Sequence, residues 1–347
     1  MSDALLDIRD MVQEFPARAA NGTRGVVHAV SNVSLEIRPG ETVGIVGESG
    51  SGKSTLARAV LGVPPPKSGQ VLLKGTNLAG LSRKHMREHM RDIQMVFQDP
   101  FSSVDAKWSV SRIVSEPLRA FNVGTRDERK RRVAEVLDLV GLDPNVYGTR
   151  RPRQLSGGQC QRVAIARALA LSPSLIICDE AVSSLDVLIQ AQVLNLFERL
   201  RSELDLAYLF IAHDLAMVKQ VSDRVAVMYL GRLCEIGPAE EIYRRPRHPY
   251  TVALLGSIPD PDPSRPRVKI DEQISGEPPS PVNPPSGCRF RTRCPRAQEK
   301  CALEVPVLQN AGTEHEVACH FPVGLAEPAV AQSVTPAGLS ANATDDV

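Results

Sequence analysis

Residues 47–54 form a glycine-rich segment, GESGSGKS, whose residue types and spacing suit phosphate binding. The apolar run at 42–46 predicts a buried strand before it, and the sequence from Lys53 onward predicts a helix after it. A strand, a glycine-rich loop and a helix in this order place backbone N–H groups and a helix N-terminus around phosphate. Lys53 should reach the β- and γ-phosphates, and the Ser54 hydroxyl should ligate Mg²⁺. The predicted nucleotide contacts of this loop are Gly47, Ser49, Gly50, Gly52, Lys53, Ser54 and Thr55.

A second phosphate-directed element lies further along the chain, where residues 155–159 read LSGGQ. Its Ser-Gly-Gly turn opens a predicted helix and offers hydroxyl and backbone N–H donors. The glycine-rich loop binds a nucleotide in its own chain, whereas this turn is expected to approach the γ-phosphate held by a second chain. Each element supplies half of a nucleotide site, so the chain is predicted to close on ATP as a dimer. The residues expected to act on the other chain's nucleotide are Ser156, Gly157, Gly158 and Gln159.

Three further apolar runs end in side chains that could complete a hydrolytic site. The run at 174–178 is followed by Asp179, which suits the Mg²⁺ shell, and Glu180, which could orient and polarise a water molecule. Another run precedes His213, which can donate a hydrogen bond to the γ-phosphate. A third precedes Gln98, whose amide can touch Mg²⁺ and the water. Glu180, His213 and Gln98 are therefore the catalytic candidates. Taken singly, solvated strand-end acids or a structural histidine are the alternative.

These motifs, in this order and spacing, resemble those of ATP-binding cassette (ABC) ATPases over residues 4–258. The resemblance implies an α/β fold built on a P-loop NTPase core with a RecA-like parallel sheet. An antiparallel β subdomain and a helical signature subdomain at 98–165 would complete a nucleotide-binding domain at 1–258. The resemblance also implies that Asp186 crosses the dimer interface and that Phe15 stacks on adenine. A core position is the alternative for that phenylalanine.

Three segments resemble more closely the ATPase subunits of oligopeptide and dipeptide importers. They are FQDPFSS at 97–103, QAQVLN at 190–195 and RHPYT at 247–251. The resemblance implies a second, identical or homologous ABC subunit, two transmembrane permease subunits and an extracytoplasmic substrate-binding protein. It further implies that ATP hydrolysis is coupled to peptide import at the cytoplasmic face of the cell membrane, where the chain is held by the permeases.

The overall composition is that of an ordinary soluble surface. A formal net charge of +1 and 23% charged residues give no basic bias, so no nucleic-acid partner is expected. No apolar stretch approaches the length of about 18 residues that a membrane span needs. The first residues lack the basic and apolar regions of a secretion signal. A membrane role is therefore expected to depend on partner subunits.

A cysteine cluster near the C-terminus predicts a metal site. In a reducing cytosol, clustered thiols favour a metal over disulfides. The wide spacing lacks the paired C-x2-C arms of most zinc ribbons and suits a 4Fe–4S cluster, with zinc or free thiols as the alternatives. The C-terminal extension of peptide-importer ATPases resembles this pattern, and some members carry a 4Fe–4S cluster there. The candidate ligands are Cys288, Cys294, Cys301 and Cys319.

Prolines mark the borders of this extension. We expect a proline-rich linker at 259–287, which together with the cysteine-containing extension covers 259–322. The stretch at 323–347 lacks aromatic and basic residues and is predicted to be a disordered tail.

Two other functions stay open at this point. A soluble ABC ATPase acting on nucleic acid or ribosomes usually carries two cassettes, a long coiled-coil insertion or a basic face, which this sequence lacks. A catalytically weak partner cassette is the second. The intact Glu180, His213 and LSGGQ argue against it, but Ala181-Val182 after the candidate base, where the family usually has Pro-Thr, keeps it open. The sequence also departs from the family at Cys160 and at Asp105-Ala106, without loss of a ligand or of the base. The cargo is selected by other subunits, and dipeptides, oligopeptides, nickel chelates and sugars remain candidates.

Overall fold

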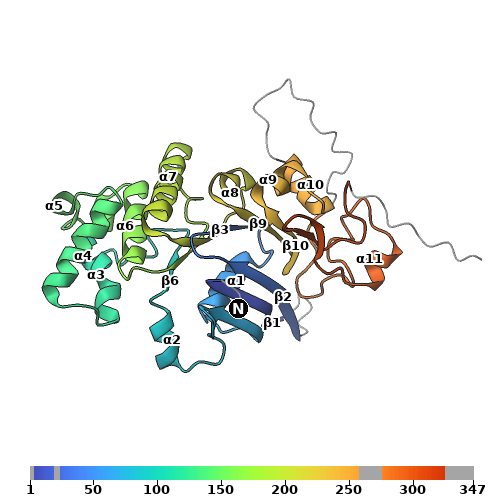
Figure 1. Cartoon of the computed structure of the whole chain (residues 1–347), viewed down its shortest axis with the longest axis horizontal. Helices are drawn as coiled ribbons and strands as arrows, with labels where there is room; N and C mark the ends of the chain where they lie inside the picture. The colour runs from blue at the N-terminus through green and yellow to red at the C-terminus, as the bar shows by residue number, and fades with distance from the viewer. Residues whose placement is uncertain (1–3, 19–23, 258–275, 325–347) are drawn as a thin grey trace, which may run out of the picture.

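The computed structural model describes residues 4–18, 24–257 and 276–324, which form two sheets surrounded by helices (Figure 1). The smaller sheet is antiparallel, with strand order β2-β1-β4-β5. Along β2 buried and exposed residues alternate, because one face of an antiparallel sheet packs on the core while the other meets water. The bounds are β1 Leu6–Arg18, β2 Arg24–Ile37, β4 Ser68–Leu73 and β5 Thr76–Asn77.

The larger sheet has the order β11-β12-β10-β9-β3-β8-β7-β6. Strands β6, β7, β8, β3 and β9 are parallel, and β10, β12 and β11 extend the sheet through antiparallel pairs. Strands β3, β7 and β8 are buried along their whole length, which explains their continuous apolar sequences, since helices cover both faces of a parallel sheet. The bounds are β3 Thr42–Val46, β6 Ile93–Val96, β7 Leu175–Asp179, β8 Ala207–Ile211, β9 Arg224–Tyr229, β10 Arg232–Pro238, β11 Gln309–Gly312 and β12 His315–Val317.

Helices α3 to α6 gather at one end of the molecule, and the C-terminal extension lies at the other (Figure 1). This helical block comprises α3 Val110–Ala120, α4 Arg126–Leu139, α5 Pro144–Tyr147, a 3₁₀ turn at Pro152–Gln154 and α6 Gly157–Leu169. The other helices are α1 Lys53–Val60, α2 Arg83–His89, α7 Val187–Leu204, α8 Leu215–Val221, α9 Ala239–Arg244, α10 Pro249–Gly256 and α11 Glu299–Leu303.

Two hydrophobic layers cover the two faces of the larger sheet. Ile177 and Leu209 pack in the layer that includes the smaller sheet and α1. Their neighbours Ile176 and Phe210 pack in the layer that includes α3, α4, α6 and α7. This alternation follows from the two-residue period of a strand, and it fixes the sheet between the two layers. The predicted α/β fold, with a parallel core sheet, an antiparallel sheet and a helical block, is confirmed.

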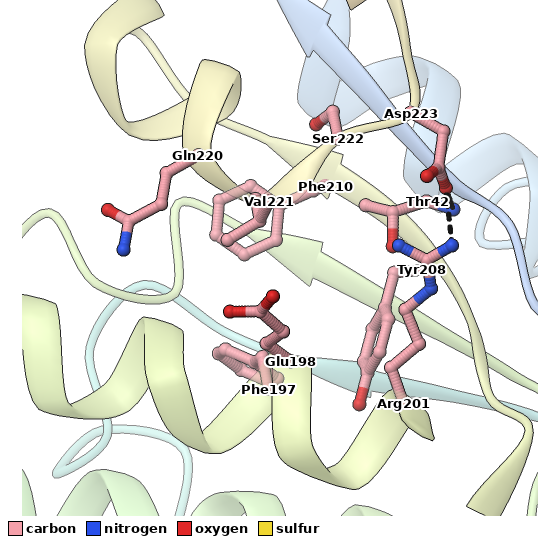
Figure 2. Close-up of a pocket in the computed structure, with 10 residues that line it drawn as sticks. All are labelled: Thr42, Phe197, Glu198, Arg201, Tyr208, Phe210, Gln220, Val221, Ser222 and Asp223. Carbon is pink, nitrogen blue, oxygen red and sulfur yellow. Dashed lines mark hydrogen bonds and ion pairs between the residues drawn. The ribbon is translucent and has the colours of Figure 1, made fainter.

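A cavity of about 190 Å³ lies between α7 and α8, and Figure 2 shows the residues that line it. Thr42 and Tyr208 line it from the first residues of β3 and the start of β8, and Arg201 Nη2 lies 2.7 Å from Asp223 Oδ2 at its rim. The cavity therefore lies at the opposite end of these strands from the glycine-rich loop. Its lining includes none of the predicted site residues among the described part of the chain.

The C-terminal extension joins the larger sheet through β12, which pairs with β10. At this junction the fully buried Glu235 accepts hydrogen bonds from the backbone N–H groups of Arg247 and His248, at 2.6 and 2.9 Å. Its Oε1 also lies 2.7 Å from Nε2 of His315, which is buried as well. A carboxylate away from water needs such partners, because an uncompensated buried charge is costly.

Parts of the predicted domain organisation lie outside the residues that the structure describes. The disordered tail predicted for 323–347 lies outside the described residues except at 323 and 324, and the linker predicted for 259–287 is described only from residue 276. The domain limits placed at 258 and 322 stay predictions. Within the described ranges, no helix combines the length and the apolar character that crossing a membrane requires.

Replacing His315 by alanine should destabilise the fold, because Glu235 stays buried but loses its side-chain partner. We expect the free energy of unfolding to fall by about 1–3 kcal/mol, the usual cost of leaving a buried polar group short of a hydrogen bond. Glu316→Ala is the matched control, since Glu316 is exposed on the same strand. Urea unfolding of both variants makes the comparison, and parental stability of the His315→Ala variant would contradict the expectation.

Candidate functional site

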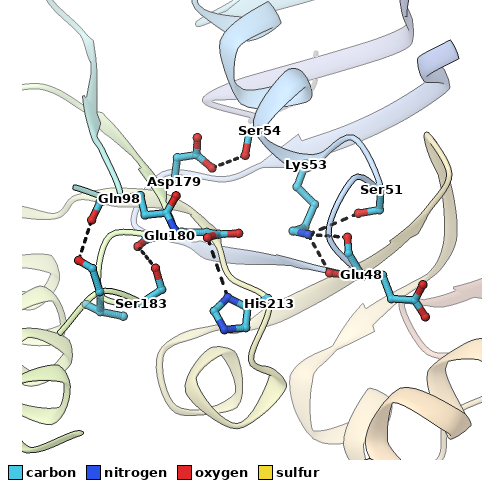
Figure 3. Close-up of polar contacts among 12 residues, drawn as sticks. Glu48, Ser51, Lys53, Ser54, Gln98, Asp179, Glu180, Ser183 and His213 are labelled. Atoms are coloured by element: carbon cyan, nitrogen blue, oxygen red, sulfur yellow. Dashed lines mark hydrogen bonds and ion pairs between the residues drawn. The ribbon is translucent and has the colours of Figure 1, made fainter. Parts of the chain in front are cut away.

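The residues predicted to do chemistry lie where parallel strands end (Figure 3). Gly47 follows β3, Asp179 is the last residue of β7, His213 follows β8 and Gln98 follows β6. Because these four strands are parallel neighbours, their carboxyl ends meet at one edge of the sheet. The larger sheet therefore brings together residues that are far apart in the sequence.

Lys53 is held inside the glycine-rich loop. Its amino group donates hydrogen bonds to the carbonyl oxygens of Gly47 at 2.7 Å and Glu48 at 3.0 Å, and only 4% of the residue is exposed. Burial lowers the pKa of Lys53, while the negative charges of Glu180, Asp179 and Glu48 oppose that shift. The loop thus holds a largely buried amine whose charged form is favoured by nearby carboxylates, and a cation at this position can pair with a phosphate.

The loop also packs tightly against the smaller sheet. Gly52, the N-cap of α1, has φ +106°, and a β-carbon there would lie 2.1 Å from the carbonyl oxygen of Ala29 in β2. No other residue type fits without moving the backbone. This contact fixes the N-terminus of α1, where Lys53 and Ser54 begin the helix.

Ser54 and Asp179 connect the phosphate loop to β7. The Ser54 hydroxyl donates a hydrogen bond of 2.7 Å to Oδ1 of Asp179, which is buried at the end of its strand. A hydroxyl and a carboxylate at this spacing are two oxygen ligands of the kind that Mg²⁺ takes. The predicted Mg²⁺ ligands Ser54 and Asp179 are therefore adjacent.

Glu180 has an unusual backbone conformation. Its φ is +52°, and its N–H donates to the carbonyl oxygen of Ile211 in β8 at 2.9 Å. The carbonyl oxygen of Glu180 accepts from the Ser183 hydroxyl at 2.9 Å. Left-handed backbone at a residue other than glycine is held only when neighbouring contacts dictate it, and it often occurs at functional sites. Here the contacts with Ile211 and Ser183 supply that constraint.

His213 and Gln98 flank Glu180. Nδ1 of His213 lies 4.0 Å from Oε2 of Glu180, and 55% of the His213 side chain is exposed. Gln98 is exposed, and its backbone carbonyl accepts from the hydroxyl of Ser184 at 3.0 Å. Gln98 is thereby connected to the segment that follows Glu180, so a movement of Gln98 would displace that segment.

The LSGGQ turn lies apart from the glycine-rich loop, at the start of α6 in the helical block. Ser156 caps α6: its hydroxyl oxygen accepts from the N–H of Gln159 at 3.3 Å, and Gln159 Oε1 accepts from the N–H of Ser156 at 3.0 Å. Ser156 is exposed, so its hydroxyl hydrogen and the first helical N–H groups can meet a ligand from outside.

This turn packs against the segment that carries Asp186. A β-carbon at Gly158 would lie 2.5 Å from Cγ2 of Ile189, in the first turn of α7. Asp186 is the exposed N-cap of α7 and accepts from the N–H of Ile189 at 3.0 Å. The signature turn and Asp186 thus lie together at the starts of α6 and α7.

Phe15 lies in β1, half-buried and paired with Val27 of β2. Its expected stacking on adenine stays a prediction.

The four candidate metal ligands line one small cavity, together with His248 and Phe290. Burial raises the pKa of Cys288 and raises that of Cys319 to about 12, so both thiols hold their protons at neutral pH. Among the described residues, no group of three or more His, Cys, Asp or Glu side chains is arranged to hold a metal ion. The predicted metal site is therefore not confirmed, although the thiols converge.

Three residues near the glycine-rich loop were not predicted from the sequence. Glu48, inside the loop, contacts Arg293 between two of the cysteines and the hydroxyl of Tyr250. Tyr250 lies in the RHPYT segment noticed above, but nothing in its sequence context points to the loop. Pairs this distant along the chain leave no local pattern.

The fold and the strand-end site define the class of P-loop NTPases, and comparison with known proteins narrows it. Residues 30–183 match the ABC transporter family, and residues 234–301 match the C-terminal region of oligopeptide/dipeptide transporters. The chain is 48% identical over 325 residues to the oligopeptide transport ATP-binding protein AppF of Bacillus subtilis, covering 92% of this chain and 98% of that protein. It is 51% identical over 292 residues to OppF of Salmonella typhimurium, covering 84% and 87%.

Solved structures agree. An ATP-binding cassette determined as a dimer in a post-hydrolysis state, with ADP and Pi, has a TM-score of 0.60 and 28% identity over 67% of this chain and 98% of that chain. The protein cbiO1 of Clostridium perfringens, part of an ABC transporter complex, has a TM-score of 0.60 and 29% identity over 70% and 92%. The chain therefore belongs to the ABC transporter ATPases, in the family of oligopeptide transport ATP-binding proteins. It is an ATPase, and ATP and Mg²⁺ are the substrate and cofactor expected of this family.

Gly158→Ala should destabilise the chain, because the new methyl group meets the branched side chain of Ile189. We expect a loss of about 1–3 kcal/mol, as for other overpacked sites. Gly157→Ala is the matched control, since its nearest neighbour would be Leu185 Cδ2 at an ordinary 3.4 Å. Adding Ile189→Ala to Gly158→Ala should recover part of the loss. Thermal unfolding of the four proteins tests this, and equal melting temperatures for both glycine variants would refute it.

Proposed function

We propose that this chain is the energy-coupling subunit of a peptide importer, in which ATP binding closes a dimer of cassettes and drives two transmembrane permeases. What carries the proposal is a match that runs through both parts of the chain, the cassette and the C-terminal region, to proteins named for oligopeptide transport. A match to the cassette alone would leave the cargo class open. In this scheme an extracytoplasmic substrate-binding protein delivers the peptide, and the chain lies at the cytoplasmic face of the membrane.

The glycine-rich loop holds the triphosphate of ATP through its backbone N–H groups and the amine of Lys53. The donor set fits Mg²⁺, because Ser54 and Asp179 already place two oxygen atoms side by side and Gln98 brings an amide oxygen from the next strand. Bound there, Mg²⁺ neutralises charge on the β- and γ-phosphates. Phe15 stacks on the adenine.

Glu180 is the proposed general base. It orients a water molecule, accepts its proton as the oxygen attacks the γ-phosphorus, and ADP departs as the bond to the bridging oxygen breaks. His213 donates a hydrogen bond to the γ-phosphate, and its position beside Glu180 supports that role. Gln98 contacts the same water, and its link to Ser184 connects loss of the γ-phosphate to the segment between Glu180 and Asp186.

The second half of each site comes from the partner chain. Ser156, Gly157, Gly158 and Gln159 of one chain approach the γ-phosphate bound by the other, and Asp186 crosses the interface beside them. Support comes from the exposed, capped N-terminus of α6, which lies apart from the glycine-rich loop of its own chain and carries a partial positive charge. The related cassette solved as a dimer with ADP and Pi supports the pairing of two nucleotide-bound cassettes.

Glu180→Gln should abolish turnover while stabilising the ATP-bound dimer, because the amide cannot accept the proton but leaves the nucleotide contacts in place. We expect kcat to fall by roughly 10²–10⁴-fold. Glu203→Gln, at an exposed acid near the end of α7, is the control. Phosphate release and gel filtration with ATP measure the two effects. Normal turnover of the Glu180→Gln variant would contradict the assigned base.

We also propose that Cys288, Cys294, Cys301 and Cys319 hold a 4Fe–4S cluster. The convergence of four thiols on one cavity supports this proposal, because soft thiolates suit iron and sulfide, although the thiols are not arranged as a metal-binding group in this structure. The chain's own contribution would be to exclude water with Phe290 and His248.

Anaerobic purification of the whole chain, followed by iron, sulfide and zinc analysis, tests the cluster. About four irons and four sulfides per chain are expected, falling towards zero in a Cys294→Ser variant. Zinc found without sulfide would indicate a zinc site in place of the 4Fe–4S cluster. Less than one equivalent of either metal would leave the thiols free.

A further inference from the structure

The segment between Cys288 and Cys294 contacts the cassette at and beside the glycine-rich loop. It sends three side chains to the cassette: Arg289, Phe290 and Arg293. The exposed Thr292 and the partly exposed Arg291 of the same segment point elsewhere, and Arg291 Nε donates instead to the carbonyl oxygen of Ser286 at 3.0 Å. The C-terminal extension therefore makes specific contacts with the cassette, and these contacts converge on the loop.

Arg293 pairs with the carboxylate of Glu48, the second residue of the loop. Its Nη1 lies 2.9 Å from Oε2 and 3.1 Å from Oε1 of Glu48, and 3.3 Å from the hydroxyl of Tyr229. Only 8% of the Arg293 side chain and 25% of the Glu48 side chain are exposed. Charge-assisted hydrogen bonds are strong when water is largely excluded, so this pair restrains Glu48.

The backbone N–H and carbonyl oxygen of Glu48 are also held by hydrogen bonds. Its N–H donates to the hydroxyl of Tyr250 at 2.8 Å, and its carbonyl oxygen accepts from the amine of Lys53 at 3.0 Å. Phe290, almost fully buried, packs against Tyr250 with ring centroids 5.3 Å apart. The side chain of Glu48 thus contacts the extension directly, and its N–H is connected to the extension through Tyr250 and Phe290. The carbonyl oxygen of Glu48 in turn holds the Lys53 amine.

A second connection reaches the glycine-rich loop at Ser51. Arg289 donates to the carbonyl oxygen of Leu230 and, at 2.9 Å, to the hydroxyl of Ser31. The next residue, Gly231, donates its N–H to the carbonyl oxygen of Ser51 at 2.7 Å. The extension therefore holds the loop at Glu48 directly and at Ser51 through the turn between β9 and β10.

We propose that Arg293 is a positioning residue for nucleotide binding: it holds Glu48 so that the loop carbonyls orient the Lys53 amine, and it neutralises a carboxylate beside the triphosphate. This inference rests on the proposed function, because it concerns the loop proposed to bind ATP. It makes ATP affinity depend on the cysteine-containing extension. Arg293 touches neither the proposed base nor the Mg²⁺ ligands, so its loss should weaken binding and leave the chemical step nearly unchanged.

The test uses the full-length chain with Mg²⁺ and a fluorescent ATP analogue, followed by steady-state hydrolysis of ATP. Arg293→Ala should raise the Kd of the analogue and the KM for ATP about tenfold, while kcat stays within about twofold. Arg293→Lys should recover part of the affinity. Arg291→Ala is the matched control, because it removes the same charge from the same segment without touching Glu48.

Glu48→Gln/Arg293→Gln separates the specific pair from a general loss of structure. If the pair acts through charge, removing both partners should restore affinity relative to Arg293→Gln alone. Parental affinity of Arg293→Ala, an equal loss in Arg291→Ala, or no recovery in the double variant would each overturn the inference. If Arg293→Ala does not fold, as judged by circular dichroism, Arg293→Lys and the double variant decide. Failure of the parent chain to bind the analogue would overturn the proposed function itself.

Discussion

Parallel pairing of β3, β8, β7 and β6 is the constraint on which the site depends. Its register sets Ile45 of β3 opposite Ile211 of β8, and Ile211 opposite Asp179 of β7. Val96 of β6 lies opposite Cys178, one residue earlier in β7. The strands therefore end almost level, and the residue that follows each one faces the same space. The spacing of the site is set by the hydrogen bonds of the sheet, which are stiffer than any loop.

On this edge the loops add charge. A buried lysine with a lowered pKa lies among three acids, and a serine is bonded to a buried aspartate. Such groups are oriented before any ligand arrives, so little reorganisation is needed when a phosphate binds. Glu180 fits the same scheme, because its strained backbone is fixed by β8 and by Ser183.

The sequence revealed those parts of the molecule whose signal is local. Apolar runs predict β3, β7 and β8, because strands of a parallel sheet are covered on both faces and therefore consist mainly of apolar residues. The serine before the glycines marks the start of α6 because it caps that helix. By contrast, Arg293 and Glu48 are 245 residues apart, and Glu235 and His315 are 80 apart. Such pairs are created by tertiary packing. The sequence alone does not distinguish a charged residue that forms such a buried pair from a charged residue on the surface.

The way in which the extension closes the larger sheet affects how the protein can assemble. β12 occupies the side of β10 that β9 leaves free, and the new edge is β11, four residues long and containing a glycine. A short, irregular border offers few unpaired N–H and C=O groups to another strand. Two copies are thereby discouraged from merging their sheets at this edge, which leaves the loops and helix ends free for the proposed dimer. A shortened chain that lacked β11 and β12 would uncover β10 and invite aggregation by strand addition.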